Sequence, residues 1–265
     1  MMKWFEVALV VLTFATGIIW LLDRLVFARR RAARAGLLEE KEPLVVDYAR
    51  AFFPVLAVVL VLRSFVAEPF RIPSSSMMPT LLIGDFILVN KFTYGIRLPV
   101  NNRKVIELGE PKRGDVVVFR PPQHPDQDWI KRVVGLPGDV ISFRGDTLYV
   151  NGEALDYTLD GQYVGEGRGR EMTGASVLEE QLGPVRHRIL EVPGFADPRG
   201  QGEWQVPTGE YFVMGDNRDR SDDSRFWGTL PESQLRGRAF LIWLNCEGWF
   251  CTGNFDVSRI GNRIQ

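Results

Sequence analysis

The sequence contains few of the residues that hold metal ions, with only two histidines and two cysteines among its 265 residues. A metal site rich in His and Cys is therefore not expected, and neither a metal nor any other cofactor is predicted. An excess of charge of one sign is also missing, since 32 Lys and Arg stand against 33 Asp and Glu and the net charge is −1. Without a basic surface field, binding of nucleic acid is disfavoured.

The 26 glycines and 16 prolines favour turns and short strands over helical bundles. Short β-branched and aromatic runs follow residue 68, at 86–89, 116–119, 129–134, 140–143, 147–150, 186–192, 211–214 and 237–244. Such runs, bounded by Gly, Pro and Asp, are typical of strands, and Asn151-Gly152 is typical of a type I′ hairpin turn. A glycine-rich loop is expected at 161–174. This part of the chain is predicted to be an all-β domain.

Two apolar runs lie near the N-terminus. The first, residues 4–22, carries only Glu6, and the second, residues 51–67, carries only Arg63. Runs of this kind predict membrane spans; a signal peptide is the alternative for the first run and a buried core helix for the second. We therefore predict a mainly β fold built from two N-terminal transmembrane helices (residues 1–22 and 51–67), a basic loop between them (23–50) and an all-β domain (68–265).

The loop between the two runs contains a cluster of arginines at residues 29–34. Short basic loops stay in the cytoplasm, so the positive-inside rule places the β domain on the outer side of the membrane. A cytosolic protein with a single anchor is the alternative.

Three consecutive serines, residues 74–76, come shortly after the second apolar run. Three serines alone are usually just a turn. Here Pro73 and Pro79 restrict the backbone on both sides, and Met77 and Met78 favour burial of the bend. A serine held in a rigid apolar bend has a defined direction of attack, but it needs a base to take its proton.

The two histidines are poor candidates for that base. His124 lies in a proline-rich loop and His187 lies between two arginines, so each is expected at the surface. Lys131 is a better candidate, because strand alternation puts it on one face with Trp129 and Val133. Burial there would lower the pKa of Lys131 and leave a neutral amine that can accept a proton. The alternative is a lysine that reaches solvent or pairs with an acid.

Four segments then carry a family resemblance: residues 73–81 (PSSSMMPTL), 112–119 (KRGDVVVF), 130–139 (IKRVVGLPGD) and 215–228 (GDNRDRSDDSRFWG). In this order behind two apolar runs, they resemble the successive boxes of bacterial type I signal peptidase (leader peptidase). The resemblance implies a multi-pass serine endopeptidase of the bacterial inner membrane, with its catalytic domain in the periplasm, that removes signal peptides from exported preproteins by a Ser–Lys dyad. Its implied partners are these signal peptides and membrane lipid, not nucleic acid, and contact with the secretion translocon is left open.

By matching position, the resemblance implies that Ser76 is the nucleophile and Lys131 the general base. Ser74 matches the hydroxyl that forms the oxyanion hole with the Ser76 N–H, and Ser221 matches the serine that orients the lysine. The implied pockets for small substrate residues at −1 and −3 consist of apolar side chains: Phe70, Ile72, Met77, Leu81, Ile87, Val118, Trp129 and Ile130.

Asp223 and Arg225 match a supporting pair near the site. Two positions depart from the family pattern, namely Ser75, where Gly is frequent, and Trp129, where Tyr or Phe commonly precedes Ile-Lys-Arg. The first departure bears on the geometry of the oxyanion hole, and the second bears on the shape of a specificity pocket. Residues 155–205 match no box and are interpreted as a family-variable insertion.

An extended substrate is expected to add as a strand beside Ser76 and an edge strand at residues 86–89. An oxidising periplasm would permit a disulfide between Cys246 and Cys251, because Gly248 lets the short loop turn back. A non-catalytic membrane-tethered β module for envelope assembly is the alternative function, but it gives no reason for a lysine on an apolar strand face. An autoproteolytic repressor with a Ser–Lys dyad would need a DNA-binding helical module in place of the membrane runs.

Overall fold

The computed structural model describes residues 2–28, 30–31, 42–99, 102–195, 197–246, 251, 253 and 255–265. The chain divides into two compact units. One contains Met1–Ala67 and Arg97–Arg103, and the other contains Glu68–Ile96 and Lys104–Gln265.

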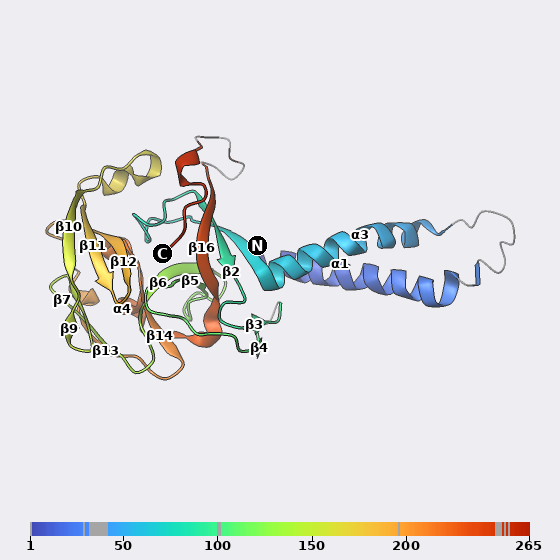
Figure 1. The fold of residues 1–265 in the computed structure, drawn as a ribbon, viewed down its shortest axis with the longest axis horizontal. Coiled ribbons are helices and arrows are strands. Elements are labelled where there is room, and N and C mark those ends of the chain that lie inside the picture. The colour runs from blue at the N-terminus through green and yellow to red at the C-terminus, as the bar shows by residue number, and fades with distance from the viewer. Residues whose placement is uncertain are drawn as a thin grey trace. The chain divides into compact units, whose positions relative to one another are not determined.

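The first unit is a pair of apolar helices, drawn in blue and cyan in Figure 1. Helix α1 (Met2–Leu22) continues into a π-helical turn, η1 (Asp23–Phe27), and α3 (Leu44–Val61) continues into a second, η2 (Leu62–Val66). With these turns the candidate spans are 24 and 23 residues long, which is enough to cross a bilayer.

The second helix begins at Leu44 and not at residue 51 as the apolar run alone suggested. Pro43 stands at its N-cap, and Asp47 falls in the first turn, where a carboxylate interacts favourably with the positive end of the helix dipole. The helix can therefore begin before the uncharged run, because its first turns accommodate charged residues. Of the basic loop, Arg31 pairs with Asp23 (2.8 Å), whereas Arg29 and residues 32–41 lie outside the described residues.

Helices α1 and α3 pack through aromatic side chains. Trp20 and Phe53 lie with their ring centroids 5.6 Å apart. Gly17 permits this contact, because a Cβ at this position would lie 2.7 Å from the Phe53 ring. Most other large apolar side chains of the two helices are exposed, as expected for surfaces that face lipid.

The second unit is built from four sheets. The largest has seven strands in the order β1-β2-β16-β5-β6-β14-β15. Their bounds are Ala67–Arg71 (β1), Asp85–Asn90 (β2), Leu235–Asn245 (β16), Val116–Phe119 (β5), Trp129–Gly135 (β6), Glu210–Met214 (β14) and Leu230–Pro231 (β15). This sheet carries the residues of the site described below.

The remaining strands form smaller sheets. Three strands form one of them, β10 (Tyr157–Gln162), β11 (Ser176–Leu182) and β12 (Val185–Glu191). Four form another, β13 (Gly202–Gln205), β7 (Val140–Arg144), β8 (Thr147–Val150) and β9 (Glu153–Ala154), and β3 (Ile96–Arg97) lies beside β4 (Lys104–Ile106). The short helical elements are α4 (Ser224–Trp227), η3 (Gly167–Met172), η4 (Pro198–Gly200), η5 (Arg218–Arg220), η6 (Glu232–Gln234) and η7 (Val257–Arg259).

The mainly β fold with two N-terminal apolar helices is thereby confirmed. Asn151 and Gly152 have φ values of 55° and 84° and join β8 to β9, as a type I′ turn requires. The glycine-rich segment at 161–174 contains the 3₁₀ helix η3 and is not a plain loop. Residues 155–205, which matched no box, supply the whole β10–β12 sheet and β13.

The expectation that residues 86–89 form an edge strand is wrong. These residues belong to β2, which lies between β1 and β16, with Ile87 opposite Ile242. Strands β2 and β16 are seen side by side in Figure 1. The edge is β1, whose residues Glu68, Pro69 and Arg71 have weak strand propensity and conceal it in the sequence. Proline has no backbone N–H and would leave a hydrogen bond unmade in an inner strand. At a sheet edge an N–H that faces solvent is not needed for pairing, so proline is tolerated there.

Both faces of the large sheet are covered by apolar clusters. One cluster contains Ile87, Val118 and Ile130, and the other contains Val117, Phe119 and Val133. A strand buried on both faces explains why residues 116–119 are continuously apolar. The same burial removes water from the polar groups that β6 carries.

Candidate active site

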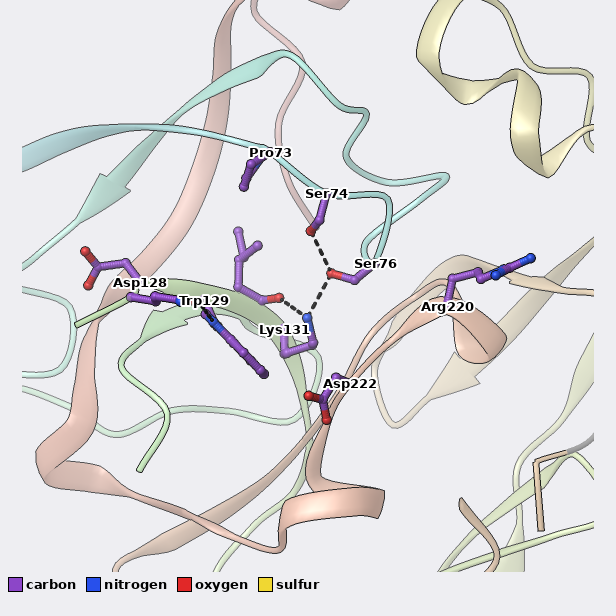
Figure 2. Close-up of a pocket in the computed structure, with 10 residues that line it drawn as sticks. Pro73, Ser74, Ser76, Asp128, Trp129, Lys131, Arg220 and Asp222 are labelled. Carbon is purple, nitrogen blue, oxygen red and sulfur yellow. Dashed lines mark hydrogen bonds between the residues drawn. The ribbon is translucent and has the colours of Figure 1, made fainter. Parts of the chain in front are cut away.

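Ser76 and Lys131 form a buried pair at the centre of the site. Lys131 Nζ lies 2.8 Å from Ser76 Oγ and donates a second hydrogen bond to the Ile130 carbonyl oxygen at 3.0 Å (Figure 2). Ser76 is 7% exposed and Lys131 4% exposed. Lys131 comes from β6, where it is paired with Val117 of β5, and Ser76 comes from the bend that follows β1. Two segments far apart in sequence therefore deliver the two groups.

The bend that carries Ser76 is held by its own backbone. Met78 N–H donates to the Ser75 carbonyl at 3.1 Å, and Leu81 N–H donates to that of Met77 at 2.9 Å. Met77 and Met78 are fully buried, as the apolar flanks predicted. Ser74 Oγ lies 3.4 Å from Ser76 Oγ, so a second hydroxyl faces the same space (Figure 2).

Burial lowers the pKa of Lys131 from its usual value to about 8. Desolvation is the largest cause, because an ammonium loses its hydration between apolar neighbours. The charges of Asp223, Asp222 and Asp216 oppose this effect and raise the pKa of Lys131. Nζ also lies 5.6 Å from the centre of the Trp129 ring, on the strand face that alternation predicted. At pH 7 about a tenth of Lys131 is therefore neutral, compared with less than about a thousandth for a lysine of ordinary pKa.

The loop at residues 215–223 fastens the serine bend in place. Asn217 N–H donates to the Ser76 carbonyl and Asn217 Nδ2 to the Ser75 carbonyl, both at 3.1 Å. Gly215 passes so close that a Cβ there would clash with the Ser76 carbonyl oxygen and with Ser221 Oγ. Only glycine fits this crossing.

Asp216 joins the bend to the lysine strand. Arg132, the neighbour of Lys131, donates to Asp216 from Nε (2.8 Å) and from its terminal nitrogen (2.7 Å). Thr80 Oγ1 donates to the same carboxylate at 2.5 Å. One buried carboxylate thus ties β6 to the end of the serine bend.

The predicted supporting pair is present in this geometry. Arg225 Nε donates to Asp223 Oδ1 at 2.8 Å, and Asp223 Oδ2 accepts the Gly215 N–H at 3.0 Å. Burial alone would raise the pKa of Asp223, but the charge and hydrogen bonds of Arg225 and the Gly215 N–H hold it below its usual value. Ser221 is buried beside this pair, and its hydroxyl adds to the lowering of the Asp223 pKa. Within the described residues Ser221 Oγ makes no hydrogen bond to Lys131 that meets ordinary distance and angle limits.

An open pocket of about 390 Å³ lies over the serine and lysine. Its walls are formed by Pro73, Ser74, Ser76, Gln127, Asp128, Trp129, Ile130, Lys131, Arg220 and Asp222 (Figure 2). Of the eight apolar residues predicted to form substrate pockets, only Trp129 and Ile130 line it. The others lie in the core cluster beneath or pack against it: Phe70, Ile72, Met77, Leu81, Ile87 and Val118.

Sequence reasoning missed the polar rim of the pocket. Gln127 and Asp128 immediately precede β6, and Arg220 and Asp222 flank Ser221 in the Asp- and Arg-rich loop. Their closeness in sequence to predicted site residues was the available signal. A loop of mixed charges gave no indication of which side chains would face the pocket.

The expectation that His187 lies at the surface is wrong. His187 is buried, with Nε2 3.2 Å from Glu180 Oε2 and 3.7 Å from Asp216 Oδ1. Desolvation and the charge of Arg132 lower the pKa of His187. It comes from the β10–β12 sheet, which no motif identified. His124 is exposed, as expected, and stacks on Trp129 with ring centroids 5.6 Å apart.

A second buried ion pair fixes the same loop from the β10–β12 sheet. Arg218 donates to Glu180 Oε2 at 2.6 Å, and both side chains are inaccessible to solvent or nearly so. Burial would raise the pKa of Glu180, but the charge and hydrogen bond of Arg218 together with the contacts of His187 outweigh burial and hold that pKa well below its usual value. Leu190 N–H also donates to the Asp216 carbonyl at 2.8 Å, so β12 supports the loop through its backbone.

The predicted disulfide partners are joined in the structure, with Cys246 and Cys251 at a Cα separation of 5.2 Å.

Among the described residues, no group of three or more His, Cys, Asp or Glu side chains is arranged to hold a metal ion. The chemistry available at the pocket is therefore that of a serine hydroxyl beside an amine of lowered pKa.

Comparison with known proteins agrees with this geometry. The family model described as signal peptidase, peptidase S26, matches residues 45–244. The chain belongs to this family. It is 47% identical to signal peptidase I of Pseudomonas fluorescens and 44% identical to that of Pseudomonas aeruginosa, in each case over 97% of this chain and 98% of the relative. Signal peptidase I of Haemophilus influenzae is 34% identical over 92% of this chain and 86% of that protein.

Membership of the signal peptidase family confirms the resemblance carried by the four segments, and with it the predicted class of serine peptidase. The non-catalytic β module is not supported. The two helices of the first unit agree with a membrane-anchored enzyme of this family.

We predict that Glu180→Gln destabilises the signal peptidase fold by about 3–5 kcal/mol, because it leaves the buried Arg218 guanidinium without its carboxylate. The matched control is Glu179→Gln, whose carboxylate is 3.7 Å from Arg186 on the exposed side of the same strand. That change should cost less than about 1 kcal/mol. Urea unfolding of the full chain in detergent measures both, and equal effects would contradict a supporting role for the buried pair.

Proposed function

We propose that this signal peptidase removes signal peptides from exported preproteins, with Ser76 as nucleophile and Lys131 as general base. The observation that carries the proposal is the 2.8 Å contact between Lys131 Nζ and Ser76 Oγ, at the bottom of an open pocket where burial lowers the lysine pKa. An amine deprotonated near working pH can take the serine proton, which a lysine of ordinary pKa cannot do efficiently.

The reaction then proceeds in two halves. Neutral Lys131 accepts the proton of Ser76 as Oγ attacks the scissile carbonyl carbon, and the resulting ammonium donates a proton to the leaving amine of the mature protein. In the second half, neutral Lys131 takes a proton from a water molecule as the water oxygen attacks the acyl carbon. The ammonium then returns a proton to Ser76 Oγ as the ester C–O bond breaks and the signal peptide leaves as a carboxylic acid. Ser74 Oγ and the Ser76 N–H are proposed to stabilise the oxyanion in both halves. Ser221, Asp223 and Arg225 are proposed to hold the surroundings of Lys131.

The pocket suits an extended peptide with small side chains. Pro73 and Ser74 form one wall, and residues 127–130 form the wall opposite, so a substrate strand can lie between two backbone segments. We propose that Trp129 and Ile130 limit the size of the substrate residues at −1 and −3. The other six predicted pocket residues, five in the core cluster and Phe70 packed against it, act by supporting these walls.

We propose that the two helices span the bacterial inner membrane and that the β domain works in the periplasm. The support comes from the lengths of the two helices and from the arginine-rich segment between them. A signal peptide is itself an apolar segment followed by a small-residue cleavage site, so its scissile bond emerges near the membrane surface. The scissile bond of the substrate and the active site of the enzyme would thus lie at a similar distance from the membrane surface.

The dyad predicts a specific set of mutant activities. Ser76→Ala and Lys131→Ala should each reduce kcat to near background, and the double variant should be little worse, because the pair acts as a unit. Lys131→Arg should be inactive at every pH, since a guanidinium stays protonated. Ser74→Ala should lose roughly 10²- to 10³-fold in kcat. Cleavage of a presequence with Ala at −1 and −3 is the assay, and near-native turnover by Lys131→Arg would eliminate Lys131 as the base.

A pH profile tests the electrostatics of the lysine separately. Because the neutral amine is the active form, kcat/KM should rise with pH through the lysine pKa of about 8. Asp222 raises that pKa by stabilising the ammonium, so Asp222→Asn should move the rising limb to lower pH. Asp160→Asn, which removes an exposed carboxylate from β10, is the control and should leave the limb in place. A shift to higher pH in Asp222→Asn would contradict the assignment.

Thiol labelling tests the proposed orientation. In a Cys246→Ser, Cys251→Ser background, Ala35→Cys should be protected from an impermeant thiol reagent added to intact cells, and Val164→Cys should be labelled after the outer membrane is made permeable. Val164 is a suitable position because its side chain is 79% exposed, whereas a Cβ at the neighbouring Gly165 would clash with backbone. Labelling of Ala35→Cys alone would reverse the orientation.

A further inference from the structure

The charged side chains around the pocket are unevenly placed. Four charged residues line it: Asp128, Lys131, Arg220 and Asp222. Asp128 is neutralised by Arg120, whose Nε lies 3.1 Å from the carboxylate. Lys131 is neutral in the reactive state and buried in every state. The charges that a substrate would meet are therefore those of Arg220 and Asp222, both exposed.

These two charges lie at different positions relative to the dyad. In Figure 2, Asp222 lies close to Lys131, whereas Arg220 lies beyond Ser76, on the side away from Trp129 and Pro73. The Arg220 side chain extends outward from the dyad. Within the part of the chain that the structure describes, its guanidinium forms no ion pair with the pocket carboxylates. The end at Trp129 thus carries only a carboxylate that is already paired, that of Asp128, and the other end carries an unneutralised cation.

The backbone beneath Arg220 is firmly held. Arg220 ends η5, and its N–H donates to the Asn217 carbonyl at 3.1 Å. Arg218 in the same turn is locked by Glu180, and Asp219 Oδ2 accepts the Val192 N–H at 2.7 Å. The base of the Arg220 side chain therefore has a defined position, while its guanidinium stays available to a substrate.

The side chains at the two ends of the pocket indicate which part of the substrate lies at each end. The proposed function places the small −1 and −3 residues against Trp129 and Ile130, and the inference here rests on that placement. The chain of the substrate must then leave the dyad on the opposite side, past Ser76, as the first residues of the mature protein. Because Arg220 and Ser76 line the same pocket, the guanidinium is placed to meet the first residues after the cleaved bond.

We propose that Arg220 is a specificity-determining residue that makes the enzyme select substrates by the charge of the first residues of the mature protein. A guanidinium binds a carboxylate through paired N–H donors and repels an ammonium. Acidic residues after the scissile bond are favoured, and lysine or arginine there is disfavoured. Because Arg220 is exposed, the selection is modest and screened by salt.

The test uses the full chain in detergent and presequence peptides with Ala at −1 and −3. Asp, Asn or Lys is placed in turn at each of the first three positions after the scissile bond, and kcat/KM is measured. At the most responsive position, wild type should prefer Asp to Lys by about threefold to tenfold. Arg220→Gln should bring this ratio close to one, and Arg220→Glu should invert it. For wild type, 1 M salt should weaken the preference.

The control is the same pair of changes at Arg144, an exposed residue of β7 that pairs with Glu203 and does not line the pocket. Arg144→Gln and Arg144→Glu change the net charge equally and should keep the wild-type ratio. An Asp-to-Lys ratio that is the same in wild type and Arg220→Glu at all three positions would overturn the proposal. Failure of wild type to cleave any presequence would instead overturn the proposed function.

Discussion

Removal of water from Lys131 is the constraint on which the rest of the site depends. An amine can act as a base near neutral pH only if its charged form is disfavoured, and in this protein that is achieved by burial in a sheet with apolar clusters on both faces. The opposing carboxylates limit the effect, so the pKa stays near 8 and does not fall further. The buried strands β5 and β6 thus lower the pKa of Lys131 as well as forming part of the core.

A buried amine is useful only if a hydroxyl is held beside it, and this is the work of the loop at residues 215–223. The loop binds the serine bend through Asn217, the lysine strand through Asp216 and Arg132, and the β10–β12 sheet through Arg218 and Glu180. The contacts of Asp216 with Arg132 and of Arg218 with Glu180 are buried, where an unpaired polar partner would be costly, and that of Asn217 with Ser75 is partly buried. The β10–β12 sheet therefore supports the loop that holds Ser76 beside Lys131.

The exposed residues of the same loop have a different relation to function. Arg220 and Asp222 line the pocket but take part in none of the buried pairs. Substitutions of these two residues are not expected to unfold the protein. In the proposed function, the charge of Arg220 acts on the substrate and that of Asp222 on the pKa of Lys131, and both effects are short-ranged because salt screens exposed charges. One loop thus combines buried residues that hold Ser76 and Lys131 in place with exposed residues that are proposed to affect substrate choice and the pH dependence of cleavage.

The sequence by itself determined the fold class, the two apolar helices, most of the strands and the candidates Ser76 and Lys131. These features depend on local patterns: hydrophobic runs, strand alternation around Lys131 and prolines around the serine bend. Only the tertiary structure decided that His187 is buried, that β1 and not β2 is the edge strand, and that six of the eight predicted pocket residues belong to the core. It also decided which charges of the loop are paired and which face the pocket. The physical reason is that burial and ion pairing depend on which segments meet, and partners such as Glu180 and Arg218 are brought together by sheet packing that no local pattern records.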